Sequence, residues 1–261
     1  TPVVGADPSS LGVLNLRGQV IPVFDLPAIV GCKPETGLNI LLVTEYARTV
    51  QAFAVESVED IARLDWTQVV PAESSGSVKS LVTSFARMKD EATGEQRLAQ
   101  VLDVEAIVNM VTPEKERPSV AGKNIGAKVK MKSNSIVLAA DDSFVARALI
   151  EQTLKELEAP FEIVKSGKEA WDRLNALADQ AASEGGSVYE KVGMVLTDLE
   201  MPEMDGFTLT SQIKQSSRLS QLPVLIHSSL SGTTNEDLVQ KVGANGYVSK
   251  FQPAELAYAI R

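Results

Sequence analysis

The sequence predicts a two-part chain, with an all-β N-terminal half and an α/β C-terminal half built on a five-stranded parallel sheet. Short apolar runs between turn signals fill the first half, and this pattern favours a small β-barrel. The second half alternates unbroken apolar strands with amphipathic helices, which is typical of βα units around a parallel sheet. Between the halves, residues 112–134 are rich in lysine and contain two prolines and two glycines, so they predict a linker.

The first half opens with a predicted β-hairpin. Two apolar runs, Leu11–Leu16 and Val20–Leu26, flank the turn dipeptide Arg17-Gly18. Pro22 lies inside the second run and lacks the N–H that a central strand needs, so it predicts an edge or bulged strand. Four more β-rich runs and one helical run complete this half, at residues 39–44, 50–55, 80–88, 96–102 and 103–111.

The second half contains five predicted βα units. The strands fall at residues 136–140, 161–164, 192–197, 223–226 and 246–248. The helices fall at residues 144–157, 167–182, 207–215, 236–242 and 254–260. The stretch 178–191 is long and polar, and we interpret it as a surface elaboration. The last helix looks cut short at Arg261, and the chain does not begin with Met, so we expect a fragment.

The composition excludes several classes of protein. The 261 residues carry a net charge of −9, which argues against nucleic-acid binding and against docking on anionic lipid. The single cysteine, Cys32, excludes an intrachain disulfide, and we interpret it as a small buried residue. No apolar run reaches membrane-spanning length and no signal peptide opens the chain, so we expect a cytoplasmic protein without direct membrane insertion.

Polar side chains follow four of the five predicted strands. Asp141 and Asp142 follow the first strand, Asp198 the third, Ser228 the fourth and Lys250 the fifth. Because parallel sheets bind ligands at the carboxyl ends of their strands, we expect all five to converge at one edge. Three carboxylates there repel one another, and a hard divalent cation such as Mg²⁺ relieves that repulsion.

This set of residues suits phosphoryl transfer to a carboxylate. An aspartate can attack a phosphoryl group when a metal ion and a lysine ammonium neutralise charge on the phosphoryl oxygens. Taken alone, the acid pair could cap a helix, the serine could hold a turn and the lysine could be solvated. Their order at successive strand ends favours a shared site. His227 lies on a buried strand and is interpreted as a packed histidine rather than a catalytic base.

Four segments resemble the receiver domains of two-component response regulators: IVLAADDS, VLTDLEMPEMDGF, PVLIHSS and GYVSKF. The resemblance covers nearly all of residues 135–261 and implies a flavodoxin-like (βα)5 fold. It implies that Mg²⁺ is bound by Asp141, Asp142, Asp198 and the main-chain carbonyl of Glu200.

The same resemblance assigns roles in phosphorylation and switching. Asp198 is implied as the phosphoacceptor and Lys250 as the phosphate-binding lysine. Ser228 is implied as the switch hydroxyl and Tyr247 as the rotating aromatic switch. The plainer interpretation of Tyr247 is an aromatic residue packed at a sheet edge.

The first half resembles the CheW-type coupling domain of bacterial chemotaxis. The run LGVLNLRGQVIPVFDL carries the likeness, with Val55-Glu56-Ser57-Val58 and the closing LAQVLDVEAIV in support. The resemblance implies an SH3-like barrel over residues 1–111, incomplete because the family's first strands are missing. It makes Arg17 a candidate for partner contact, whereas turn chemistry alone predicts a solvated arginine.

A coupling domain fused to a receiver is the architecture of CheV-type chemotaxis coupling proteins. This resemblance implies an adaptor at chemoreceptor arrays that joins methyl-accepting chemoreceptors to the histidine kinase CheA. It implies no enzyme activity beyond Mg²⁺-dependent self-phosphotransfer and dephosphorylation. The alternative is a phosphate sink that buffers the kinase. A DNA-binding regulator is disfavoured by the acidic charge, and an aspartyl-phosphate phosphatase by the acid pair after the first strand.

Overall fold

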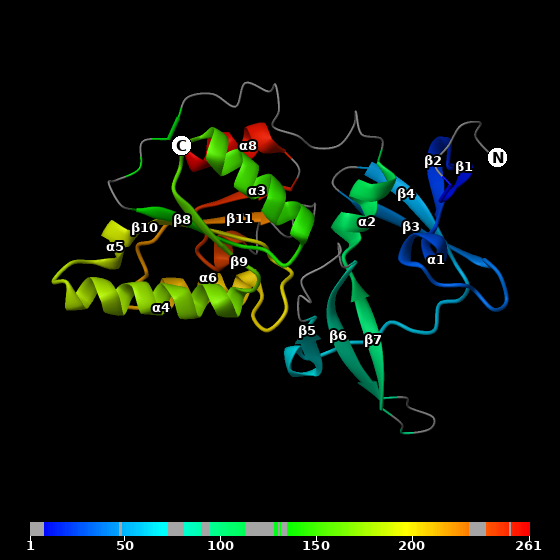
Figure 1. The fold of residues 1–261 in the computed structure, drawn as a ribbon, viewed down its shortest axis with the longest axis horizontal. Coiled ribbons are helices and arrows are strands. Elements are labelled where there is room, and N and C mark those ends of the chain that lie inside the picture. Colours follow the sequence, from blue (N-terminus) through cyan, green and yellow to red (C-terminus); the bar gives the residue numbers. More distant parts are fainter. Residues whose placement is uncertain are drawn as a thin grey trace. The chain divides into compact units, whose positions relative to one another are not determined.

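The computed structural model describes residues 8–46, 49–72, 81–89, 94, 96–112, 128–129, 131, 135–229, 239–250 and 252–261. The chain divides into two compact units, Thr1–Arg63 with Val104–Arg117, and Leu64–Asp103 with Pro118–Arg261. Figure 1 shows their helices and strands, coloured from blue at the N-terminus to red at the C-terminus. None of the described helices is both long and apolar enough to cross a membrane.

The first unit contains a four-stranded sheet in the order β1-β2-β4-β3. Its strands are β1 (Ser10–Leu16), β2 (Gln19–Asp25), β3 (Ile40–Tyr46) and β4 (Thr49–Val55). The predicted hairpin is confirmed, because β1 and β2 pair antiparallel and close at Leu16 and Gln19. Arg17 and Gly18 have φ values of 52° and 87°, as a two-residue type I′ turn requires. Asn15 Oδ1 accepts a hydrogen bond of 3.0 Å from the Gly18 N–H and holds the turn.

The prediction that Pro22 marks an edge or bulged strand is wrong. Strand β2 lies inside the sheet, between β1 and β4. Pro22 pairs with Val13 of β1, but the parallel ladder to β4 begins one residue later, where Val23 pairs with Ala52. The missing N–H of the proline therefore interrupts no β2–β4 hydrogen bond, and the described bulge in this pair of strands lies near Gly12 instead.

A short helix, α1 (Leu26–Val30), begins where the sequence predicted the end of a strand. The Asp25 carboxylate accepts a hydrogen bond of 2.9 Å from the Ala28 N–H, and Gly31 ends the helix with a φ of 79°. Cys32 follows this glycine and is exposed, so its predicted burial is wrong. The helical run near residue 103 is confirmed as α2 (Val104–Val111).

The second unit includes a three-stranded antiparallel sheet, β5 (Val69–Pro71), β6 (Val82–Lys89) and β7 (Gln96–Leu102). Strands β6 and β7 form the pair that the sequence predicts. Strand β5 and the preceding 3-10 turn η1 (Trp66–Gln68) were not predicted, because three residues are too few to show a periodic pattern.

The rest of this unit is the predicted five-stranded parallel sheet, and its strands lie in the order β12-β11-β10-β8-β9. The strands are β8 (Ile136–Ala140), β9 (Phe161–Val164), β10 (Val192–Thr197), β11 (Val224–Ser228) and β12 (Gly246–Ser249). The helices are α3 (Phe144–Glu156), α4 (Gly167–Ser183), α5 (Val188–Lys191), α6 (Gly206–Gln215) and α8 (Pro253–Ile260). The helix predicted at residues 236–242 lies mostly outside the described residues.

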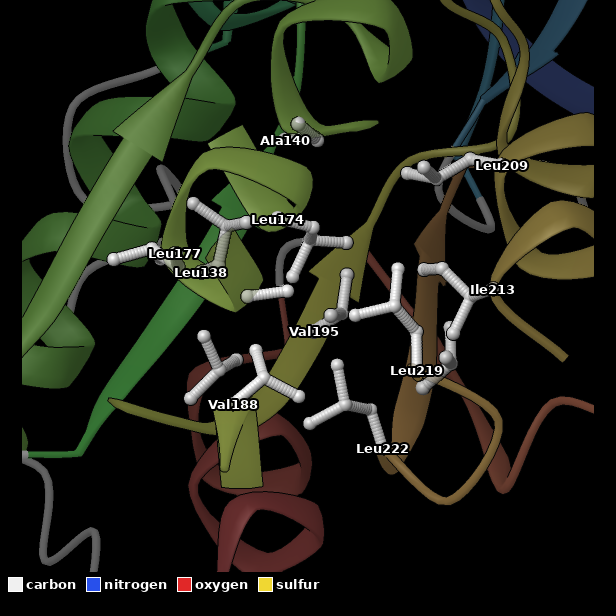
Figure 2. Packing of buried hydrophobic residues seen from close by; sticks show 14 of the residues in the cluster. Leu138, Ala140, Leu174, Leu177, Val188, Val195, Leu209, Ile213, Leu219 and Leu222 are labelled. Carbon is white, nitrogen blue, oxygen red and sulfur yellow. The ribbon is translucent and has the colours of Figure 1, made fainter. Parts of the chain in front are cut away.

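Both faces of the parallel sheet are buried. Val195 of β10 packs with Leu174 of α4 and Leu209 of α6, and Figure 2 shows this cluster. The next residue, Leu196, points to the opposite face and packs in the cluster that α3 and α8 cover. Val188 of α5 is also buried in the first cluster, so the stretch 178–191 contributes to the core and is not only a surface elaboration.

The end of the predicted linker is packed against this unit. The Val129 N–H donates a 3.1 Å hydrogen bond to the carbonyl of Leu157, directly after α3. Val129 and Met131 pack against the cluster beneath α3 and α8, and Lys128 forms an ion pair with Glu158. These described linker residues therefore belong to the compact unit of the parallel sheet.

Candidate functional site

Three aspartates meet at the carboxyl ends of two neighbouring strands. Asp141 and Asp142 follow β8, and Asp198 follows β10. The last residues of these strands, Ala140 and Thr197, pair directly, so the residues after them are neighbours. Each carboxylate offers an oxygen within 4.8 Å of the others. The structure thus brings together the three acids that the sequence singled out.

Lys250 joins two of these acids. Its Nζ lies 2.8 Å from Asp141 Oδ2 and 2.8 Å from Asp198 Oδ2. The lysine is only 2% exposed, which excludes the interpretation of a solvated lysine. A buried ammonium is tolerated when carboxylates compensate its charge, and here it has two. Its main-chain N–H also donates to the carbonyl of Ser228, at 2.9 Å.

The start of α3 fixes the acid pair. Ser143 is the N-cap residue, and its Oγ accepts a hydrogen bond from the Ala146 N–H. The Ser143 N–H donates to Asp141 Oδ1 at 2.9 Å, and Arg147 Nη1 donates to the main-chain carbonyl of Asp141 at 2.8 Å. The alternative that the acid pair caps the helix is therefore wrong, because Ser143 does so.

The loop between β10 and α6 holds Asp198 tightly. Asp198 Oδ1 accepts a 2.6 Å hydrogen bond from the Leu199 N–H, and the Gly206 N–H donates to the Leu199 carbonyl. A Cβ on Gly206 would lie 2.0 Å from the Asp198 carbonyl oxygen, so only glycine fits there. Glu200 lies in this loop, two residues after Asp198, with an exposed side chain.

Ser228 and Tyr247 are linked across strands β11 and β12. Ser228 is the buried last residue of β11, and the predicted strand ended two residues earlier. The Tyr247 hydroxyl lies 3.5 Å from the main-chain oxygen of Ser228, to which it donates a long hydrogen bond. The tyrosine is half-buried and packs against Leu199 and Ile226. Both predicted switch residues therefore lie at the same edge as Lys250.

His227 is a packed, neutral histidine, as the sequence predicts. It is 1% exposed, and neither ring nitrogen has a hydrogen-bond partner among the described residues. Burial, and secondarily the positive charge of Lys250, lowers its pKa to about 3. It therefore carries no charge near neutral pH.

The charge balance of the site suits a divalent cation. Three carboxylates and one ammonium leave two negative charges at an edge where Asp141 and Asp198 are buried. Carboxylate oxygens are the ligands that hard cations such as Mg²⁺ prefer.

Arg17 belongs to the other compact unit, where it lies exposed in the β1–β2 turn.

Sequence reasoning missed the contacts that orient the acids. Arg147 donates to the main-chain carbonyl of Asp141, and the main-chain N–H of Leu199 donates to Asp198. Because each hydrogen bond uses a main-chain group, the residue types alone do not reveal these contacts. The four-residue spacing from Ser143 to Arg147 is the one signal available, since it places both on the same face of the helix.

The family comparisons divide the chain by sequence into two parts. Residues 1–112 match the model of the CheW-like domain, and residues 137–261 match the model of the response regulator receiver domain. The fold and the acid–lysine site thus define a receiver protein that also carries a CheW-like domain. The chain carries both of these domains, and curated relatives named CheV are similar to it over most of its length.

Individual relatives cover the whole chain or its second half. Chemotaxis protein CheV2 of Helicobacter pylori is 29% identical over 97% of this chain and 80% of that protein. CheV3 of the same organism is 27% identical over 96% of this chain and 78% of that protein. Two-component response regulator ORR5 of Oryza sativa is 35% identical over 46% of this chain and 82% of that protein.

Solved structures match the second half. The receiver domain of the Arabidopsis thaliana histidine kinase CKI1, complexed with Mg²⁺, is 26% identical with a TM-score of 0.45, over 51% of this chain and 94% of that chain. Chemotaxis protein CheY4 of Vibrio cholerae, crystallised at low pH, is 26% identical with a TM-score of 0.41, over 49% of this chain and 97% of that chain.

Proposed function

We propose that this chain is a chemotaxis adaptor that couples methyl-accepting chemoreceptors to the histidine kinase CheA, and that phosphorylation of Asp198 regulates the coupling. The arrangement that supports this most is the buried pairing of Asp198 with Lys250 and Asp141, in a chain that also carries a CheW-like domain. The names of the relatives point to the same pathway. The place of action would be the cytoplasmic receptor array.

Mg²⁺ would be held by Asp141, Asp142, Asp198 and the main-chain carbonyl of Glu200. When bound, it supplies positive charge that offsets the charge of the phosphoryl oxygens. The three acids fit this role because their oxygens lie within 4.8 Å of one another.

The residues of the chain supply the rest of the chemistry. A carboxylate oxygen of Asp198 attacks the phosphorus of the phosphohistidine on the kinase. The bond from phosphorus to that histidine nitrogen breaks, and the nitrogen keeps the electron pair. The product is an acyl phosphate, which water later hydrolyses. Lys250 lies 2.8 Å from Asp198 Oδ2, and its ammonium would bond the oxygens of the new phosphoryl group. The Leu199 N–H keeps the carboxylate in a fixed orientation during the attack.

Ser228 and Tyr247 would transmit the change. The Ser228 hydroxyl is expected to bond a phosphoryl oxygen, and its main-chain carbonyl is already the acceptor for the Tyr247 hydroxyl and the Lys250 N–H. A shift of Ser228 toward the phosphoryl group therefore alters the contact that positions Tyr247.

The signal would reach the N-terminal domain through the linker. We take residues 1–111 as the coupling domain, 112–134 as the linker and 135–261 as the receiver. Helix α3 begins beside Asp141 and ends beside the linker residue Val129, so one helix spans from the site to the linker. Arg17 at the exposed hairpin turn is the candidate contact to a partner.

A co-purification experiment tests the adaptor function. The full chain is mixed with the kinase and with receptor signalling fragments, with and without phosphorylation. An adaptor binds both partners, and phosphorylation changes the amount retained. A phosphate sink, the alternative, would bind the kinase only transiently and would not retain receptors.

A further inference from the structure

The loop that follows Asp198 contains one residue in a strained backbone conformation. Glu203 has a φ of 65°, a left-handed value that glycine adopts without cost but that a residue with a Cβ avoids. The same loop contains Glu200, the proposed main-chain ligand of Mg²⁺. A strained backbone conformation persists only where surrounding contacts hold it, so strain beside a site indicates such a contact.

The Glu203 side chain makes that contact. Ser166 Oγ donates a hydrogen bond of 3.1 Å to Glu203 Oε2. Ser166 is 3% exposed and is the N-cap residue of α4. Its oxygen accepts the Glu169 N–H, while the Glu169 carboxylate accepts the N–H of Lys165, the residue before the N-cap. Capping uses a lone pair of the serine oxygen, so its proton is left to bond Glu203.

The main chains of α4 and the β10–α6 loop also approach each other closely beside this contact. A Cβ on Gly167, the first residue of α4, would lie 2.3 Å from the carbonyl oxygen of Met204. Only glycine fits at the first position of α4, and a left-handed glutamate costs stability in a loop. Both residues lie where α4 meets the loop of Asp198, so the sequence accepts one unfavourable backbone conformation at this contact.

We propose that Glu203 is a positioning residue for the metal site. Its hydrogen bond to Ser166 fastens the β10–α6 loop to α4 and so fixes the Glu200 carbonyl relative to the three aspartates. Without it, Mg²⁺ binding has to order the loop as well, which weakens the affinity. The inference rests on the proposed function, because it concerns the metal site of the receiver.

Calorimetric titration of the full chain with Mg²⁺ tests this. Glu203→Gly removes the hydrogen bond and relieves the strain, and we expect the dissociation constant to rise about fivefold, the usual net effect of one hydrogen bond. Glu203→Gln keeps an oxygen acceptor without the charge, and we expect it to bind Mg²⁺ nearly as tightly as the unaltered chain. The pair of variants separates the hydrogen bond from the charge.

A partner variant and a stability measurement complete the test. Ser166→Ala should weaken Mg²⁺ binding as well, and combining it with Glu203→Gly should add little, because both remove one contact. Urea unfolding without Mg²⁺ should show Glu203→Gly as stable as the unaltered chain, which excludes misfolding as the cause.

Two results would overturn the inference alone: unchanged Mg²⁺ affinity in Glu203→Gly, or equal weakening in Glu203→Gly and Glu203→Gln. Absence of Mg²⁺ binding by the unaltered chain would overturn the proposed function, and this inference with it.

Discussion

Lys250 forms ion pairs with Asp141 and Asp198 at once, and its Nζ lies 2.8 Å from Oδ2 of each. All three residues are buried, so the lysine charge is what permits two carboxylates to lie side by side away from water. The pairing defines the site as a lysine that bridges Asp141 and Asp198.

Replacing this lysine should destabilise the chain and make it more dependent on Mg²⁺. Lys250→Met leaves the two carboxylates uncompensated, so we expect the free energy of unfolding to fall by about 3 kcal/mol without metal. Added Mg²⁺ should restore part of the loss, since a cation replaces the ammonium. Urea denaturation with and without Mg²⁺ measures both effects. Lys241→Met, at an exposed lysine, is the control and should change little.

Asp198→Asn should abolish acid-labile labelling by acetyl phosphate or by the phosphorylated kinase. The amide cannot attack phosphorus, and the neighbouring Asp141 carboxylate is engaged by Lys250 and by the start of α3. Labelling with radioactive donor, followed by acid and base treatment, measures this. Asp172→Asn, at an acid on α4, should label normally. Full labelling of the Asp198 variant would exclude the assignment.

Gly206→Ala should disturb the site without touching any charged residue. Its Cβ would lie 2.0 Å from the Asp198 carbonyl oxygen, and neither main-chain group can move freely. We expect a loss of about 1–3 kcal/mol in stability and a slowing of phosphorylation by up to about a hundredfold. Gly186→Ala is the matched control, because the one close neighbour of its Cβ would be the flexible end of Glu190, and the Ala181 carbonyl oxygen lies at an ordinary 3.7 Å. Equal behaviour of the two variants would contradict the argument.

The buried His227 should make the fold sensitive to acid. Its pKa is lowered to about 3 in the folded chain, whereas a histidine in the unfolded chain titrates near 6.5. Below that pH the unfolded state binds a proton that the folded state excludes, so stability falls by up to about 1.4 kcal/mol per pH unit. His227→Leu removes this term. The unfolding free energy of His227→Leu minus that of the unaltered chain should rise from pH 7.5 to pH 5. A constant difference would exclude this account.

Phosphorylation should change the protection of the linker end. Beryllofluoride, which mimics the phosphoryl group on an aspartate, should alter hydrogen exchange at Ser228, at Tyr247 and at the Val129 amide that bonds Leu157. In Met131→Ser the Val129 amide should exchange faster in both states, because the packing beside it is lost. Changes confined to the acid cluster would count against a relay through the linker.

The sequence could predict the parallel sheet and the members of its site because one rule connects them. Asp141, Asp198 and Lys250 each lie at a strand end, and parallel strands place their ends at one edge. Such a rule needs only the strand order along the chain. The position of Lys250 between two acids could not be predicted, since it depends on the side-chain path across neighbouring strands.

Other features were missed for identifiable reasons. Pro22 predicts an edge or bulged strand because the sequence does not reveal where the ladder to β4 begins. Helix α1 is five residues long, too short for helical periodicity. The contact between Ser166 and Glu203 joins residues far apart in the chain, and only the fold brings them together.

The packing of Val129 and Met131 has a consequence for exchanging receivers between proteins. A chimaera joined at Ser135 would replace Met131, whose methyl group lies against Gly193, with a foreign residue. It would also replace Val129, whose side chain packs beside α3 and whose N–H donates to the Leu157 carbonyl. A transferred receiver domain that should keep its response to phosphorylation therefore needs its native residues from Lys128 onward. Its packing begins before its first strand.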